Sequence, residues 1–117
     1  MVLIPSITAL GIVSLAYVFV FGAPFAPEVW QDRDLKAWEV TARIGGRPEV
    51  RGVGANVLGD PWEALSWLVN ECSSYGMPLL EGQVISTGTC VVPVAVTEGE
   101  TLEADYGTGE GLRVSFA

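Results

Sequence analysis

The first 27 residues carry no charged side chain, and this stretch constrains the fold more than any other feature of the sequence. Pro5 and Pro24 bracket 18 of these residues, which is the lower limit of length for a membrane-spanning helix. However, residues 17–21 are all β-branched or aromatic, and such side chains favour a pleated sheet over a helix. We therefore predict a strand, buried on both faces, that ends at Gly22. A membrane or secretory segment over residues 6–23 stays open as an alternative.

Length, charge and composition exclude several classes of function. A chain of 117 residues hides roughly two-thirds of its unfolded surface, which suffices for one core but not for separate cofactor and substrate domains. The net charge of -8 repels phosphate backbones and anionic lipid, which argues against a nucleic-acid partner. The chain has no histidine, so Ser-His and Cys-His couples and the commonest zinc ligand are absent. For Cys72 and Cys90 we predict buried, reduced and unreactive thiols.

The middle of the chain predicts a hairpin followed by a helix. Apolar and polar residues alternate from Trp38 to Ile44, as in a strand with one buried face, and Gly45-Gly46 supplies a tight turn back to residues 48–51. Asp60 can cap a helix that runs to about Tyr75, with Pro61 at its first position and Glu63 completing a capping box.

This helix carries one apolar stripe, and a positive-φ glycine at Gly76 is expected to end it. The stripe consists of Leu65, Leu68, Val69 and Cys72. Four shorter segments with strand composition follow, at residues 83–87, 91–96, 101–106 and 112–116. The predicted fold class is α+β and mainly β: a twisted sheet or roll, with one amphipathic helix packed across it and the apolar first strand inside.

Several segments together resemble one enzyme family. They are Gly54-Ala55-Asn56-Val57-Leu58-Gly59-Asp60-Pro61, residues 64–70, residues 80–89, Val92-Pro93-Val94, residues 98–101, Ala104-Asp105-Tyr106-Gly107 and residues 114–117. In order and spacing they are similar to the C-terminal half of the 2-keto-4-pentenoate hydratase and 4-oxalocrotonate decarboxylase group, within the fumarylacetoacetate-hydrolase superfamily. The resemblance divides the chain into a divergent apolar segment, residues 1–17, and a hydratase-like C-terminal domain, residues 18–117.

The resemblance implies a cytoplasmic lyase that hydrates or decarboxylates an unsaturated 2-oxo acid, in the catabolism of aromatic compounds. In such enzymes Mg²⁺ or Mn²⁺ stabilises the substrate enolate. The family holds this metal with a Glu-x-Glu pair and a further Glu, all upstream of the strand near Val18, and this chain has no such region. We therefore expect a truncated fold whose metal ligands lie outside this chain, and catalytic residues cannot be assigned. A non-catalytic remnant, or a structural partner of a full-length homologue, is the alternative.

The loop Thr87-Gly88-Thr89 is the predicted substrate-binding element, since the family places a Ser or Thr loop beside its substrate. Glycine lets main-chain donors, together with the Thr89 hydroxyl, approach a carboxylate; an ordinary turn or bulge is the other interpretation. Glu98-Gly99-Glu100 resembles a metal-binding pair but is expected to be an exposed turn, and Asp105 a surface strand residue. The exposed sheet edges and apolar surface of a truncated roll predict a homo-oligomer or a hetero-oligomer with a related chain.

Overall fold

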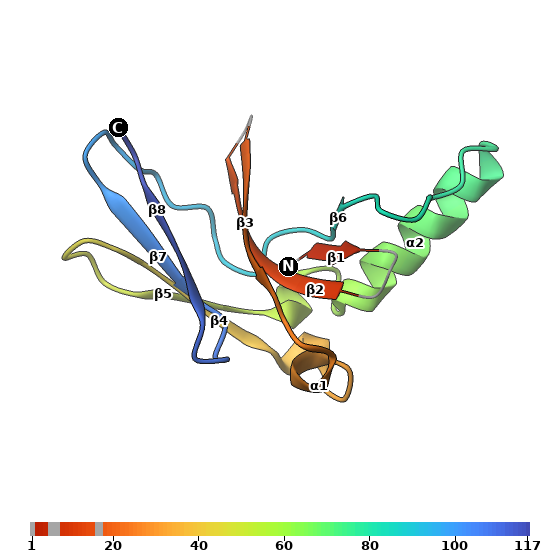
Figure 1. The fold of residues 1–117 in the computed structure, drawn as a ribbon, viewed down its shortest axis with the longest axis horizontal. Helices are drawn as coiled ribbons and strands as arrows, with labels where there is room; N and C mark the ends of the chain where they lie inside the picture. Colours follow the sequence, from red (N-terminus) through yellow and green to blue (C-terminus); the bar gives the residue numbers. More distant parts are fainter. Residues whose placement is uncertain (1, 5–7, 16–17) are drawn as a thin grey trace.

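The computed structural model describes residues 2–4, 8–15 and 18–117 (Figure 1). Within these residues the chain forms two antiparallel sheets of four strands each. The first sheet has the order β3-β2-β1-β6, with β1 at Val2–Ile4, β2 at Thr8–Leu15, β3 at Val18–Pro24 and β6 at Ile85–Ser86. The second has the order β5-β4-β7-β8, with β4 at Glu39–Ile44, β5 at Val50–Val53, β7 at Thr101–Asp105 and β8 at Gly111–Ser115. The mainly β class is therefore confirmed.

The second sheet follows the predicted alternation closely. Val40, Ala42 and Ile44 are buried on β4, whereas Glu39 and Arg43 are exposed. The predicted hairpin is confirmed, since β5 returns antiparallel along β4 and Gly45 adopts a φ of +49° in the turn. β4 is a central strand because β7 pairs with its other edge.

The apolar first segment forms strands, but the prediction of burial on both faces is wrong. β3 spans Val18–Pro24 and lies at the edge of its sheet, paired with β2. Val20 is half-buried, and the Phe21 side chain is 48% exposed. Tyr17, which the prediction included in this strand, lies outside the described residues. No helix in the described ranges is long and apolar enough to cross a membrane.

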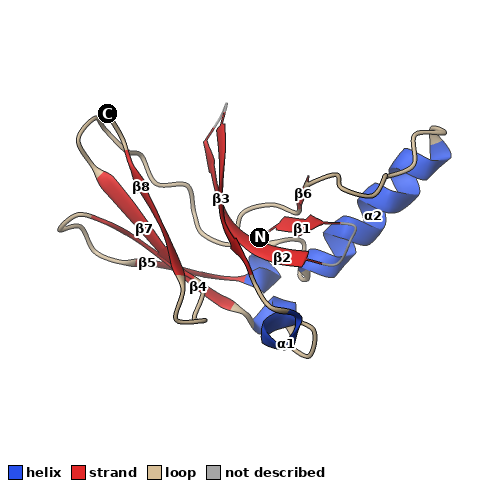
Figure 2. Cartoon of the chain, in the orientation of Figure 1, coloured by secondary structure: helices blue, strands red, loops and turns tan. Residues whose placement is uncertain are grey.

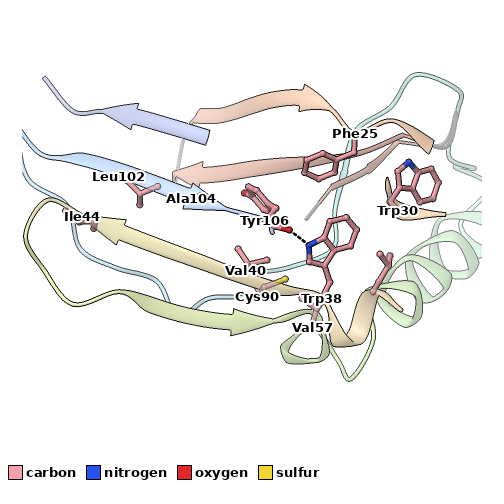
Figure 3. Packing of buried hydrophobic residues seen from close by; sticks show 11 residues of the cluster. Phe25, Trp30, Trp38, Val40, Ile44, Val57, Cys90, Leu102, Ala104 and Tyr106 are labelled. Atoms are coloured by element: carbon pink, nitrogen blue, oxygen red, sulfur yellow. Dashed lines mark hydrogen bonds between the residues drawn. The ribbon is translucent and has the colours of Figure 1, made fainter. Parts of the chain in front are cut away.

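Aromatic side chains fill the core where the first sheet approaches the second (Figure 3). Phe25 stacks on Trp38 with 5.7 Å between ring centroids, and its ring meets Tyr106 edge-on at 5.9 Å. The buried Trp38 Nε1 donates a hydrogen bond to the main-chain oxygen of Tyr106. Trp30 joins this cluster from the short helix α1, Pro27–Trp30.

Helix α2 spans Pro61–Ser74, as its capping residues predict. The Asp60 carboxylate accepts the Trp62 N–H at 2.9 Å, and Gly76 ends the helix with a φ of +69°. The helix does not pack across the sheet, however. Ala64 and Leu65 in its first turns contact the core, whereas its later turns project away from both sheets (Figure 2), and Trp67 is 60% exposed.

The later strands were predicted with mixed success. β7 and β8 are confirmed, and the predicted strand at 83–87 is reduced to the two residues of β6. The predicted strand at 91–96 is wrong, because these residues form an irregular segment. Pro93 offers no N–H to a sheet, and Val94 and Val96 instead pack their side chains against the core from outside any strand.

Candidate functional site

The predicted substrate-binding loop lies directly after β6, where the chain leaves the first sheet. Ile85 on β6 is buried, Thr87 is half-buried, and Gly88 and Thr89 are exposed. Gly88 has a φ of +126°, which strongly favours glycine. The loop therefore reaches the surface at Gly88 through a backbone conformation that other residues rarely adopt.

Residues 52–57 of the same chain confine this loop from one side. A Cβ atom added at Gly52 on β5 would lie 1.9 Å from the main-chain oxygen of Cys90, so the two backbones touch. The Asn56 Nδ2 atom donates a 2.7 Å hydrogen bond to the same oxygen. Val57, which is buried, lies beneath Gly88, whose added Cβ would meet the Val57 Cγ1 at 3.2 Å.

Residues 52–57 therefore surround the predicted loop, and the sequence analysis did not place them there. Gly54 marks a second close approach, since a Cβ atom there would lie 1.8 Å from the Leu35 oxygen. It begins the short 3-10 helix η2, Gly54–Asn56, which brings Asn56 to the loop. The signal was present, because this segment opens the motif that carried the family resemblance. Its partner, Cys90, is 34 residues from Asn56 in the sequence, and no local pattern reveals such a contact.

The donors that the loop can offer are mainly main-chain groups. The N–H groups of Gly88 and Thr89 make no hydrogen bond to other described residues. The Thr89 hydroxyl, which we expected to approach a carboxylate, donates instead to the main-chain oxygen of Val91. Its oxygen can still accept a hydrogen bond, but donation to a ligand would require that internal bond to break.

The Glu98-Gly99-Glu100 segment is a turn, as predicted. The Glu100 carboxylate accepts the Thr97 N–H at 2.7 Å and is hydrogen-bonded to the Arg47 guanidinium. These contacts, led by the Thr97 N–H, lower the pKa of Glu100 from its ordinary value. Both acceptor oxygens of Glu100 therefore hold the turn together.

Asp105 is exposed on β7, as expected, and accepts the Gly107 N–H at 2.7 Å. Cys90 is buried and reduced, whereas Cys72 is half-buried. Within residues 2–4, 8–15 and 18–117 no three His, Cys, Asp or Glu side chains converge as metal ligands would. The described residues thus do not fit a divalent metal.

Two hollows of about 320 Å³ each lie away from the loop. One lies between the sheets and is lined by Gly22, Phe25, Tyr106 and Leu112, among others. The other lies over the charged outer face of the second sheet, beside Arg43 and Glu103. Arg43 already pairs with Glu49 at 2.9 Å and Arg113 with Glu103 at 3.7 Å, which is typical of a solvated face.

The fold is a mainly β unit, and it is similar to part of larger hydratases and a decarboxylase. No family model matches the chain. Over 101 residues it is 34% identical to the 2-oxo-hept-4-ene-1,7-dioate hydratase of Escherichia coli, covering 86% of this chain and 37% of the hydratase. It is also 34% identical to a 2-keto-4-pentenoate hydratase of Burkholderia vietnamiensis, over 85% of this chain and 37% of that protein.

Solved structures show similarity to a related enzyme, a decarboxylase. The 4-oxalocrotonate decarboxylase of Pseudomonas putida G7, complexed with calcium and acetate, superposes with a TM-score of 0.74 at 26% identity, covering 85% of this chain and 38% of the decarboxylase. The same enzyme complexed with magnesium and adipate gives a TM-score of 0.71.

These relatives confirm the predicted resemblance to the 2-keto-4-pentenoate hydratase and 4-oxalocrotonate decarboxylase group. The chain spans 37% of the length of the two hydratases, which is less than the half that the sequence suggested. The activity of these enzymes belongs to the whole proteins, and for this chain it is therefore a proposal.

Proposed function

We propose that this chain is one part of a lyase that hydrates or decarboxylates an unsaturated 2-oxo acid, and that it has no activity by itself. The similarity to hydratases and to a decarboxylase over about 85% of the chain supports this assignment. The unit would be residues 18–117 of a fumarylacetoacetate-hydrolase-like fold, preceded by a divergent segment at residues 1–17, and it would act in the cytoplasm.

Within this unit, the loop Thr87-Gly88-Thr89 would bind the carboxylate end of the substrate. The observation that carries this role is that Gly88 and Thr89 are exposed residues whose main-chain N–H groups make no hydrogen bond to other described residues. Adjacent main-chain N–H groups are suited to a carboxylate because each donates a hydrogen bond to one of its oxygens and keeps its proton during the reaction. Thr87 and Thr89 would form the walls of the site and add hydroxyl oxygens.

A divalent ion, which the decarboxylase structures contain, would be held by residues outside this sequence, since the described residues bring no ligand group together. In a homo-oligomer or a hetero-oligomer, a second copy or a related polypeptide would complete the substrate site. The alternative function, a structural partner without catalysis, rests on the same missing ligand group.

The test compares the chain alone with the chain in a complementing mixture. We would mix it with a fragment of the E. coli hydratase that contains the part the alignment leaves uncovered, and follow loss of 2-hydroxypenta-2,4-dienoate in Mg²⁺. We expect turnover from the mixture and none from either part. Turnover by this chain alone would overturn the proposal.

One double variant separates the proposed lyase from the structural partner. Thr87→Val with Thr89→Val keeps the shape of both side chains while removing their hydroxyls. In the lyase, this change raises the KM of the mixture or abolishes turnover. In the structural partner, the mixture keeps the kinetics of wild type, and binding between the two polypeptides is the only property that this chain contributes.

A further inference from the structure

One side chain from a distant segment holds the end of the proposed substrate loop. Asn56 follows β5 in the sequence, and its Nδ2 atom donates to the main-chain oxygen of Cys90 at 2.7 Å. Cys90 directly follows Thr89, so the bond acts one residue from the N–H group of Thr89 and two residues from that of Gly88, the groups proposed to bind the substrate. The hydrogen bond from the Thr89 hydroxyl to the main-chain oxygen of Val91, by contrast, is local and spans two residues.

The contacts at Gly52 and Val57 limit the loop in a different way. Both are van der Waals contacts. Gly52 has no side chain, so the Cys90 oxygen can come close, and the Val57 side chain packs against Gly88. Such contacts stop the loop from moving inward, but they do not fix the direction of a peptide plane. A hydrogen bond to the Cys90 carbonyl does, because hydrogen bonds weaken steeply as they depart from alignment.

We infer that Asn56 is a positioning residue for the substrate loop. By holding the Cys90 carbonyl it restricts the torsion angles that connect Cys90 to Thr89, and thereby the directions of the N–H groups of Gly88 and Thr89. The effect on substrate rests on the proposed function, whereas the effect on the loop does not. Asn56 acts through the loop, and it makes no contribution to the chemistry itself.

The first measurement tests the loop in the free chain and needs no activity. Asn56→Asp keeps the shape of the side chain but replaces its N–H donor by an acceptor, which faces the Cys90 oxygen unfavourably. Backbone ¹⁵N relaxation should show the order parameters of Gly88 and Thr89 falling from near about 0.85 to below about 0.6. Asn56→Ala should give the same result, since it also removes the donor.

Asn70→Asp is the matched control, because Asn70 is exposed on α2 and undergoes the same change of charge. Its loop order parameters should equal those of wild type. In every variant the order parameter of the buried Leu102 reports whether the second sheet is still folded. Wild-type order parameters at Gly88 and Thr89 in both folded Asn56 variants would overturn the inference.

The second measurement uses the complemented mixture described above. Loss of one hydrogen bond that orients the loop should raise the KM of the Asn56→Asp mixture by about 2- to 10-fold with kcat unchanged. A fall in kcat at constant KM would contradict a positioning role in substrate binding. If the wild-type mixture has no turnover while the loop still loosens in the Asn56 variants, the proposed function fails and the positioning of the loop stands.

Discussion

Replacing Gly52 with alanine tests the contact on which the candidate site is built. The new Cβ atom would lie 1.9 Å from the main-chain oxygen of Cys90 and 2.5 Å from its carbonyl carbon. Both atoms belong to the backbone, so no side-chain rotation can relieve the overlap. β5 and the segment that carries Cys90 must therefore separate, or the fold must adjust around them.

The energetic cost can be worked out from the contacts that separation disturbs. Forcing an extra carbon into a close-packed site costs about 1–3 kcal/mol. Separation also breaks the hydrogen bond from Asn56 to Cys90, which is worth about 0.5–1.5 kcal/mol. We therefore expect Gly52→Ala to lower the free energy of unfolding by about 2–4 kcal/mol, and the Tm by roughly 6–20 °C for a domain of this size.

Urea denaturation followed by tryptophan fluorescence measures this loss. Gly46→Ala is the matched control, because a Cβ atom at Gly46 meets nothing within 4 Å, and its free energy of unfolding should change by no more than about 1 kcal/mol, with stabilisation the expected direction. If Gly52→Ala and Gly46→Ala unfold at the same urea concentration with the same slope, the close approach of β5 to Cys90 is refuted.

Three further substitutions test other parts of the fold by the same urea method. Trp38→Phe removes the Nε1 donor that bonds the Tyr106 oxygen and should lower the free energy of unfolding by about 1–3 kcal/mol. Asp60→Ala removes the cap of α2 and should cost about 1 kcal/mol. The fold lowers the pKa of Glu100, chiefly through the Thr97 N–H, so its ionised form stabilises the protein above the ordinary pKa and this stabilisation is lost as the pH falls through the lowered value. Glu100→Gln should therefore be less stable than wild type at neutral pH, and the difference should disappear on acidification.

The elements that the sequence predicted well are those set by neighbouring residues. Asp60 and Pro61 start α2, and Gly76 ends it, through contacts within a few residues of each helix end. The alternation on β4 likewise predicts which side chains are buried, because successive strand residues point to opposite faces. In both cases the residues that determine the structure lie within the same short segment of the sequence.

Predictions failed where the cause lies in another part of the chain. The apolar composition of β3 indicated burial on both faces, but Phe21 is 48% exposed, since no other segment covers that side chain fully. The stripe on α2 indicated packing along the whole helix, but its first turns alone reach the core and Val69 stays exposed. Local pattern shows that a surface is apolar, and it does not show what covers that surface.

The motif that carried the resemblance illustrates the same point for function. Gly54 in this motif, and Gly52 just before it, are required because the main-chain oxygens of Leu35 and Cys90 lie within 2 Å of where their Cβ atoms would be. Asn56 holds the segment of Cys90 by a hydrogen bond. These residues maintain the junction between segments, and none of them needs to touch a substrate. Similarity in this motif is therefore evidence for a retained scaffold and is equally compatible with a lyase unit and with a structural partner. The proposed role of the exposed loop at Gly88 is what separates the two functions, so the variants of Asn56 and of the loop threonines are the decisive ones.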